Sequence, residues 1–305
     1  MPFFDLSLIF EPAKQKGKQP NEISSPERHS LEARIDALVH LGYTVIAINH
    51  VVQSKFQQPA PDFGLRKRDG VIILRRLTIV LDEASEKGFG LTNNNASSLA
   101  SYDIISLLPT TQTSFSLACL THSMPGPLTA HIISLDLSSQ PRLPFYLKHT
   151  LIRTAIRNGA VFEIPYAPAL SPNDEHKRRN WWANAREVAR VTHGKSILLS
   201  GGGQTIADLR APLDVANVAT LLGIAQNLAR DALSTTPKSL VLRAQTRKTY
   251  RAVLSEPKLM LPSSTQRFFL GLDTNRYVNC RASGDGSHVY GRTSRSSHFA
   301  AAYRK

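Results

Sequence analysis

Cysteines and long hydrophobic runs are what this sequence has least of. Its 305 residues include two cysteines, Cys119 and Cys280, which are not spaced as a CxxC pair. We therefore expect neither a disulfide framework nor a thiolate zinc site, and a reducing compartment fits best. No stretch approaches the roughly 18 uninterrupted apolar residues that span a bilayer. The apolar residues 1–10 contain Asp5 and lack a basic start, so we interpret them as a strand rather than a signal peptide.

Acidic residues and nucleotide-binding motifs are also scarce. The chain has 37 Lys+Arg against 23 Asp+Glu, which gives a net charge of +14 and a pI near 10.0. Such a charge favours a polyanionic partner, either nucleic acid or an anionic membrane surface, and the lack of a spanning segment leaves only surface adsorption for the latter. No GxSxG, Walker or GxGxxG motif is present, and we interpret the glycines at 201–203 as only a flexible turn after a strand.

Short apolar runs alternate with longer helical patterns, which is typical of βα units around a parallel sheet. The expected strands are residues 3–9, 43–48, 71–81, 104–108, 130–135, 161–164 and 197–200. Seven strands are enough to close a barrel. We therefore predict an α/β fold, a TIM-like (βα)7 barrel with extra C-terminal helices.

Capping residues and composition mark the boundaries. Ser25 and Pro26 suit the start of a helix, and Gly42 suits its end. Residues 173–193 give the clearest helical pattern, and residues 208–254 form a helical stretch broken at Gly223 and Pro237. Residues 53–70 suggest a long surface loop. We place one domain at 1–254 and a basic Ser/Gly/Arg-rich tail, expected to be disordered, at 255–305, which contributes 8 − 3 = +5 of the net charge.

The ends of the first two expected strands carry a recognisable pattern. The first reads FFDLSLI from Phe3, and the second ends in AINH at residues 47–50. Both resemble the PHP superfamily of metal-dependent phosphoesterases, distorted (βα)7 barrels whose first strand usually ends in Asp-Leu-His-x-His and whose second ends in Ala-Ile-Thr-Asp-His. Asp5 and Leu6 match this pattern, but the two histidines fall on Ser7 and Ile9.

This departure predicts an empty metal site. Ile9 has no donor atom for a metal, and Ser7 is a poor ligand beside an imidazole. We expect Asp5, Ser7, Ile9, Asn49 and His50 to be vestigial positions of such a site, with no metal or other cofactor held by the protein. A single His50 cannot hold a catalytic metal, and we favour a structural, hydrogen-bonding role for it.

Several phrases, in order along the chain, resemble one branch of this superfamily. That branch is the TIM-barrel-like protein subunit of archaeal and eukaryotic ribonuclease P, which eukaryotes share with RNase MRP. The phrases are LGY at 41–43 leading to AINH, RLTI at 76–79, LPFY at 143–146, GAVFE at 159–163 with Tyr166 and Pro168, RAPLDVAN at 210–217 and TRKT at 246–249.

The resemblance carries several expectations with it. It implies a catalytic RNA with its own Mg²⁺, precursor tRNA as the substrate of the particle, and a counterpart role with the RNase MRP RNA in processing ribosomal RNA. It also implies a small α/β protein partner, no membrane association, and a location in the nucleus and nucleolus.

Two basic triplets are candidates for RNA contact. Arg66, Lys67 and Arg68 lie in the long loop, where cations can meet phosphates or simply face solvent. Lys177, Arg178 and Arg179 precede Trp181 and Trp182 in the clearest helix. The tryptophans offer base stacking, but at mid-helix they more often belong to a core.

The C-terminal helices add further candidates. Arg243, Arg247 and Arg251 recur at intervals of four, with Lys248 beside them. Like charges at this spacing repel each other, so we expect an RNA-facing stripe rather than a merely solvated face. Arg210 either clamps a phosphate or pairs with Asp214, and the sequence does not separate these two roles.

We therefore hypothesise a non-catalytic RNA-binding subunit of the ribonuclease P and RNase MRP particles. Two alternatives stay open. One is a PHP-type phosphoesterase with a metal site rebuilt from Asp5, His50 and Glu163, and the other is a free-standing RNA-binding protein.

Overall fold

The computed structural model describes residues 2–10, 25–53, 63–82, 91, 95–170 and 174–248. The chain divides into two units, Met1–Glu256 and Pro257–Lys305, and all the described residues belong to the first. Arg251, the tail at 255–305 and residues 54–62 of the expected loop at 53–70 lie outside the described residues, so the predicted domain boundary stays a prediction.

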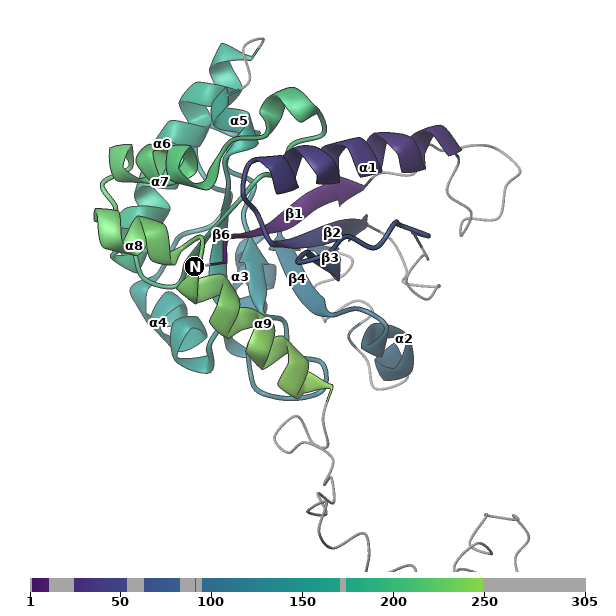
Figure 1. Cartoon of the computed structure of the whole chain (residues 1–305). Coiled ribbons are helices and arrows are strands. Elements are labelled where there is room, and N and C mark those ends of the chain that lie inside the picture. Colours follow the sequence, from purple (N-terminus) through teal and green to yellow (C-terminus); the bar gives the residue numbers. More distant parts are fainter. Residues whose placement is uncertain are drawn as a thin grey trace, which may run out of the picture. The chain divides into compact units, whose positions relative to one another are not determined.

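Seven parallel strands form one sheet in the order of the sequence, as predicted (Figure 1). They are β1 (Phe4–Phe10), β2 (Val45–Val52), β3 (Ile72–Leu81), β4 (Ile104–Pro109), β5 (Ile132–Ser134), β6 (Val161–Pro165) and β7 (Ile197–Ser200). The first strand also lies against the last, since the Gly202 N–H donates to the Ser7 carbonyl at 3.0 Å. The sheet is thus a nearly closed barrel, and the predicted fold class is confirmed.

Helices surround the barrel and close one end of it. They are α1 (Ser25–His40), α2 (Ala96–Ala100), α3 (Gln112–Leu120), α4 (His149–Asn158), α5 (Ala167–Leu170), α6 (Glu175–Thr192), the 3-10 turn η2 (Ile206–Asp208), α7 (Pro212–Leu221), α8 (Gln226–Asp231) and α9 (Thr235–Arg247). No helix among the described residues is long and apolar enough to cross a membrane.

The predicted helix boundaries hold at most points, with one correction. Gly42 and Gly223 have φ values of 99° and 93°, so the first ends a helix and the second breaks the C-terminal helical stretch where expected. The helix expected over 173–193 runs from Glu175 to Thr192, and His193 caps it at φ 53°. Pro237 does not break the last stretch, because it lies in the first turn of α9, where a missing N–H removes no helical hydrogen bond.

The barrel interior has an apolar floor. Side chains near the amino-terminal ends of the strands form it, and Leu240 and Ala244 of α9 pack against them from below. The strand residues of this floor are Phe4, Leu6, Val45, Ala47, Leu74, Ile104, Ile132, Val161 and Leu198. Since α9 seals this end, the next inward-facing residues along the strands define the interior of the barrel.

Candidate nucleic-acid interface and the barrel interior

A layer of polar side chains lies directly above the apolar floor. Alternate residues of a barrel strand face inward, so the residues two positions beyond the floor on the later strands, Asn49, Arg76, Ser106, Glu163 and Ser200, converge there. Asp5 and Ser7 join them because the register of β1 shifts between Asp5 and Leu8. Register places Asn49 beside Arg76, and Ser134 beside Glu163. The buried polar residues of this layer are Asp5, Ser7, Asn49, Arg76, Thr78, Ser106, Glu163 and Ser200.

Arg76 and Glu163 form a fully buried ion pair in this layer. Arg76 Nη1 donates to Glu163 Oε1 at 2.5 Å and to the Leu6 carbonyl at 2.7 Å. Its Nη2 contacts Glu163 Oε2 and donates to Ser106 Oγ at 2.9 Å. Burial opposes ionisation of Glu163, but the charge and hydrogen bonds of Arg76 outweigh it and lower the pKa of Glu163. A guanidinium thus supplies the positive charge inside the barrel.

Three of the predicted vestigial positions are brought together here. Asp5 Oδ1 accepts from the backbone N–H groups of Ser7 and Gly201, both at 3.1 Å. Asn49 donates through Nδ2 to Ser7 Oγ at 3.3 Å and accepts at Oδ1 from Thr78 at 2.6 Å. Burial, which outweighs these backbone hydrogen bonds, raises the pKa of Asp5, and the neighbouring Glu163 adds to this effect.

The other two positions do not join this group. His50 follows Asn49 on the strand and faces the opposite side of the sheet, where its Nδ1 lies 2.9 Å from the Tyr102 hydroxyl. Burial lowers the pKa of His50. Ile9 contributes only its carbonyl, which accepts from Arg34 Nη1 at 2.9 Å.

These residues do not fit a divalent metal. Both carboxylate oxygens of Glu163 are taken by Arg76, and the hydroxyl of Ser7 is bonded to an amide. Within the described ranges, no group of three or more His, Cys, Asp or Glu residues could hold a metal ion. The alternative site built from Asp5, His50 and Glu163 is therefore not assembled, because His50 lies on the other face of β2.

The glycines after β7 are closely packed, so the expectation of only a flexible turn is wrong. A Cβ atom on Gly201 would lie 2.8 Å from Asp5 Oδ2, and one on Gly203 would lie 2.6 Å from Asp208 Cβ. Gly202 has a φ of +64° and leaves only 2.9 Å to Pro165 Cβ. Each position therefore excludes a larger side chain for steric reasons.

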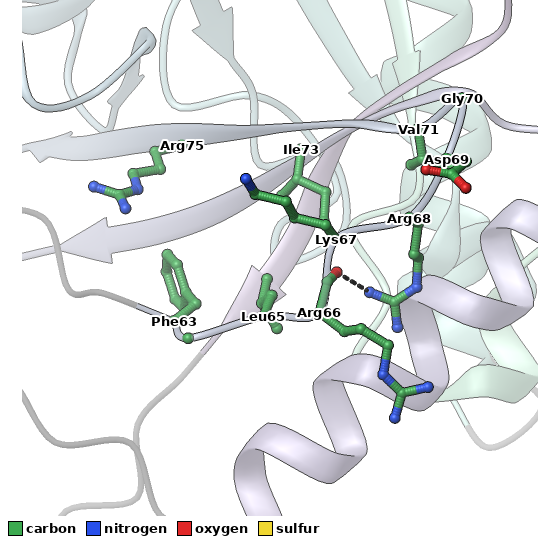
Figure 2. A pocket seen from close by; sticks show the side chains of 11 residues that line it. Phe63, Leu65, Arg66, Lys67, Arg68, Asp69, Gly70, Val71, Ile73 and Arg75 are labelled. Carbon is green, nitrogen blue, oxygen red and sulfur yellow. Dashed lines mark hydrogen bonds between the residues drawn. The ribbon is translucent and has the colours of Figure 1, made fainter.

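The loop triplet lies beside a hollow of about 550 Å³ at the start of β3, lined in part by Arg75. Arg66 and Lys67 are exposed. Arg68 is only 11% exposed, with its Nε donating to Asp36 at 2.6 Å. Figure 2 shows the Arg68 guanidinium turned back onto the carbonyl of Arg66. Arg66 and Lys67 are therefore the two cations of this triplet that stand open to a partner.

The triplet at the start of α6 is exposed, whereas the first tryptophan after it is not. Lys177, Arg178 and Arg179 all face solvent, and Lys177 pairs with Asp174 at 2.7 Å. Trp181 is 1% exposed and donates from Nε1 to the Pro165 carbonyl at 2.6 Å. Trp182 is half-buried and packs edge-on against Trp181. Trp181 is thus a core residue, as favoured from its position, and cannot stack on a base.

The predicted arginine stripe on the last helix is wrong at Arg247. This side chain is 5% exposed, and its guanidinium donates to the carbonyls of Tyr102 at 2.6 Å, Pro127 at 3.4 Å and Leu99 at 3.5 Å. Burial lowers its pKa to about 10. The reason is geometric, since α9 runs under the barrel and its last turn meets loop carbonyls that need donors.

The other described cations of the predicted stripe, Arg243 and Lys248, are at the surface and have different partners. Arg243 is exposed and donates to the Gly159 carbonyl. Lys248 pairs with Asp103 at 2.7 Å. These cations still lie at the surface, and their predicted contact with RNA stays a prediction.

Arg210 is held by the main chain around it. Its Nη1 donates to the carbonyls of Ala207 at 2.6 Å and Leu209 at 2.8 Å. Its own carbonyl accepts from the Tyr43 hydroxyl at 3.1 Å. The described part of the chain contains no ion pair between Arg210 and Asp214, so that interpretation fails and the phosphate contact stays a prediction.

The sequence interpretation missed Arg76, which carries most of the interior electrostatics. A partial signal was available, because β3 has a partner strand on each side and carries two adjacent arginines, Arg75 and Arg76, which must face opposite sides of the sheet. A buried guanidinium is stabilised by a carboxylate or by carbonyl groups, and Glu163, a carboxylate inside another apolar strand, is a candidate partner.

Comparison with known proteins identifies the family. The model of the family described as RNase P subunit p30 matches residues 3–249. "Ribonuclease P protein subunit p30" of Mus musculus is 31% identical over 247 residues, covering 77% of this chain and 88% of the relative. "Ribonuclease P/MRP protein subunit RPP1" of Saccharomyces cerevisiae is 26% identical over 239 residues, covering 74% and 76%.

A solved structure supports the fold independently. A chain in the cryo-EM structure of archaeal ribonuclease P with mature tRNA is similar, with a TM-score of 0.54 and 12% identity. The likeness covers 85% of this chain and 100% of that one. At this identity it bears on the fold alone, whereas the family match covers most of the sequence. This chain therefore belongs to the RNase P subunit p30 family and is a protein subunit of ribonuclease P.

Proposed function

We propose that this subunit has no catalytic activity of its own and acts as a rigid, basic scaffold that binds RNA. One observation carries the proposal. In the barrel interior, where a phosphoesterase of this fold would hold its metal, Arg76 and Glu163 form an ion pair with each other. The described residues of this barrel include no group of three or more His, Cys, Asp or Glu that could hold a metal. Arg76 occupies both carboxylate oxygens of Glu163, which leaves Asp5 without a second free carboxylate for acid–base work. Cleavage then belongs to the RNA and its own Mg²⁺.

The positive charge is the functional property of this scaffold. The chain carries a net charge of +14, and cations at its surface offset the repulsion between phosphates where RNA segments converge. The exposed side chains that support this role are Arg66, Lys67, Lys177, Arg178, Arg179, Arg243 and Lys248.

The finer assignments follow from the family. We propose that the particle removes the 5′ leader of precursor tRNA, in the nucleus and nucleolus, and that this subunit binds a small α/β protein of the same particle. The name of the yeast relative includes MRP. We extend the proposal to RNase MRP and to ribosomal RNA processing on that ground and on the sequence resemblance.

The test is to purify the tagged full-length chain from its own cells and to sequence the RNA bound to it. One abundant structured RNA of the ribonuclease P type, with precursor-tRNA cleavage in the eluate, is the expected result. A heterogeneous RNA pool would instead make the chain a free-standing RNA-binding protein and overturn the proposal.

The chain purified free of RNA and of partner proteins distinguishes a scaffold from a phosphoesterase. We expect the isolated chain to hold no stoichiometric Mn or Zn and to hydrolyse no phosphoesters. Stoichiometric metal with turnover that disappears in His50→Ala would overturn the non-catalytic assignment. His50→Gln is the matched control, because glutamine keeps a polar group beside Tyr102 but is a poor metal ligand.

A further inference from the structure

The outer face of α4 carries a basic stripe that the sequence interpretation did not single out. His149, Arg153 and Arg157 are all exposed and recur at intervals of four residues, so they lie along one side of the helix. Ile152 and Ala155 on the opposite side are buried. Successive members of the stripe are about 6 Å apart along the helix axis.

No carboxylate of the surrounding segment offsets this stripe. Between Ile104 and Phe162 the sequence contains one acidic residue, Asp136. It is engaged locally, since Asp136 Oδ1 accepts from the backbone N–H groups of Ser138 at 3.1 Å and Ser139 at 3.2 Å. Within the described ranges Arg153 and Arg157 form no ion pair. Their charges therefore repel each other without a counter-charge on their own element.

The helices packed against α4 do not supply a counter-charge either. On one side lies α3, which contains no charged residue. On the other side lies α6, whose Glu187 comes near His149 but is held by Arg190 through two hydrogen bonds, at 2.6 and 2.9 Å. The stacked rings of His149 and His193, 6.1 Å apart, join the two helices at this end.

The stripe continues beyond the end of α4. Arg243 of α9 reaches the carbonyl of Gly159, the C-cap residue two positions after Arg157. Cations near a helix C-terminus are favoured by the helix dipole, and this explains Arg157 and Arg243 without a ligand. The dipole falls off within the last turn, so it does not explain Arg153 in the middle of the helix.

We propose that Arg153, Arg157 and Arg243 form a contact surface for the sugar–phosphate backbone of an RNA strand. Arg153 and Arg157 have no counter-charge on α4, and Arg243 lies at the C-terminal end of that helix, where Asp231 lines the same hollow. Guanidinium groups placed this way fit phosphates, each of which accepts paired hydrogen bonds from a guanidinium. This inference rests on the proposed function, because it names the surface through which the scaffold holds RNA. It also assigns Arg243 to a surface shared with α4, in place of the predicted stripe on α9, which is wrong at Arg247.

The test compares two double variants of the full-length chain in binding to a transcript of the cognate ribonuclease P RNA over a series of KCl concentrations. R153Q/R157Q removes both charges, and R153K/R157K keeps them as the matched control. We expect the first to lower the slope of log affinity against log salt by about 1.5 in total, and the second to leave it unchanged. Because both side chains are exposed, both variants should melt like the wild type.

Each other outcome is decisive. An unchanged slope for R153Q/R157Q, with RNA binding by the wild type intact, overturns this surface and leaves the proposed function standing. Unchanged RNA binding together with loss of a co-purifying protein subunit assigns the surface to a protein partner and also overturns the inference. A wild-type chain that does not bind the transcript would count against the proposed function itself.

Discussion

A buried guanidinium is stable inside a protein when a carboxylate and hydrogen-bond acceptors surround it, and Arg76 meets this condition. Its partners are Glu163, Ser106 and the Leu6 carbonyl, and the ion pair is 0% and 1% exposed. Removing one member of such a pair leaves the other as an uncompensated buried charge. Removing both together avoids that cost.

Arg76→Met should therefore lower the free energy of unfolding by about 3–5 kcal/mol, and R76M/E163Q should recover much of this loss. Denaturant unfolding of the two variants measures both values. The matched control is Arg190→Met, which breaks the exposed pair with Glu187 and should leave stability unchanged within error. A double variant no more stable than the single one would show that Arg76 acts through packing rather than charge.

His131 is a second buried polar residue with a measurable consequence. It is 2% exposed, and neither ring nitrogen has a hydrogen-bond partner among the described residues. Burial, together with the charges of Arg247 and Arg243, lowers its pKa to about 3 from 6.5. As the pH falls below 6.5, His131 becomes protonated in the unfolded chain but stays neutral in the folded chain. The unfolded state is therefore favoured, and His131 makes the protein less stable in acid.

Between pH 8 and pH 5 this linkage should remove about 2 kcal/mol from the free energy of unfolding. His131→Leu should flatten the pH dependence by that amount, and at pH 8, where the imidazole is neutral in both states, it should not destabilise the protein. Urea unfolding at the two pH values checks both statements. An unaltered pH dependence in the variant would mean that the folded protein accepts the proton at His131.

Part of this interior could be predicted from the sequence. The strand-end motifs correctly predicted that Asp5, Ser7 and Asn49 lie together, because the ends of neighbouring parallel strands lie side by side. The partnership of Arg76 and Glu163 could not be read from motifs, since the two residues are 87 positions apart and meet across the barrel. His50 was placed with its neighbour Asn49, although consecutive residues of a strand face opposite sides.

At the scale of elements, the strands could be predicted from the sequence. Each one is a short apolar run between turn residues, and this pattern depends only on the local sequence. The prediction of an exposed arginine stripe failed for α9. Residue spacing shows which side of a helix a residue lies on, but not how deeply that side is buried. Arg243 and Arg247 lie on the same side by spacing, yet the first is exposed and the second is 5% exposed where the helix passes beneath the barrel. Depth depends on which elements lie below, and those come from distant parts of the chain.

This difference in depth predicts opposite phenotypes for two arginines of one helix. Arg247→Ala should lower the free energy of unfolding by at least about 2 kcal/mol, because three carbonyls lose a charged donor. Arg243→Ala should leave stability nearly unchanged and reduce the salt dependence of RNA binding. Urea unfolding and RNA titration of each variant separate the two effects. A stable R247A chain with weakened RNA binding would restore the stripe on α9.

At the scale of the whole molecule, charge predicts the partner better than any single residue does. The net charge of +14 is spread over both the barrel and the tail sequence, so no one cluster accounts for it. A surface of this kind repels itself in the free protein and attracts RNA in the complex. Salt screens both interactions, and it therefore acts in opposite directions on the two states.

The opposite effects of salt on the stability of the free chain and of the RNA complex can be measured by thermal unfolding of the full-length chain with and without ribonuclease P RNA. At low salt and a free RNA concentration 100 times Kd, binding should stabilise the folded chain by about 2.7 kcal/mol. Raising KCl to about 0.5 M should abolish this gain, because counterion release no longer favours the complex. The melting temperature of the free chain should not fall over the same range, since salt relieves its self-repulsion. A gain that persists at high salt would mean that base or shape recognition, rather than phosphate contact, holds this subunit on its RNA.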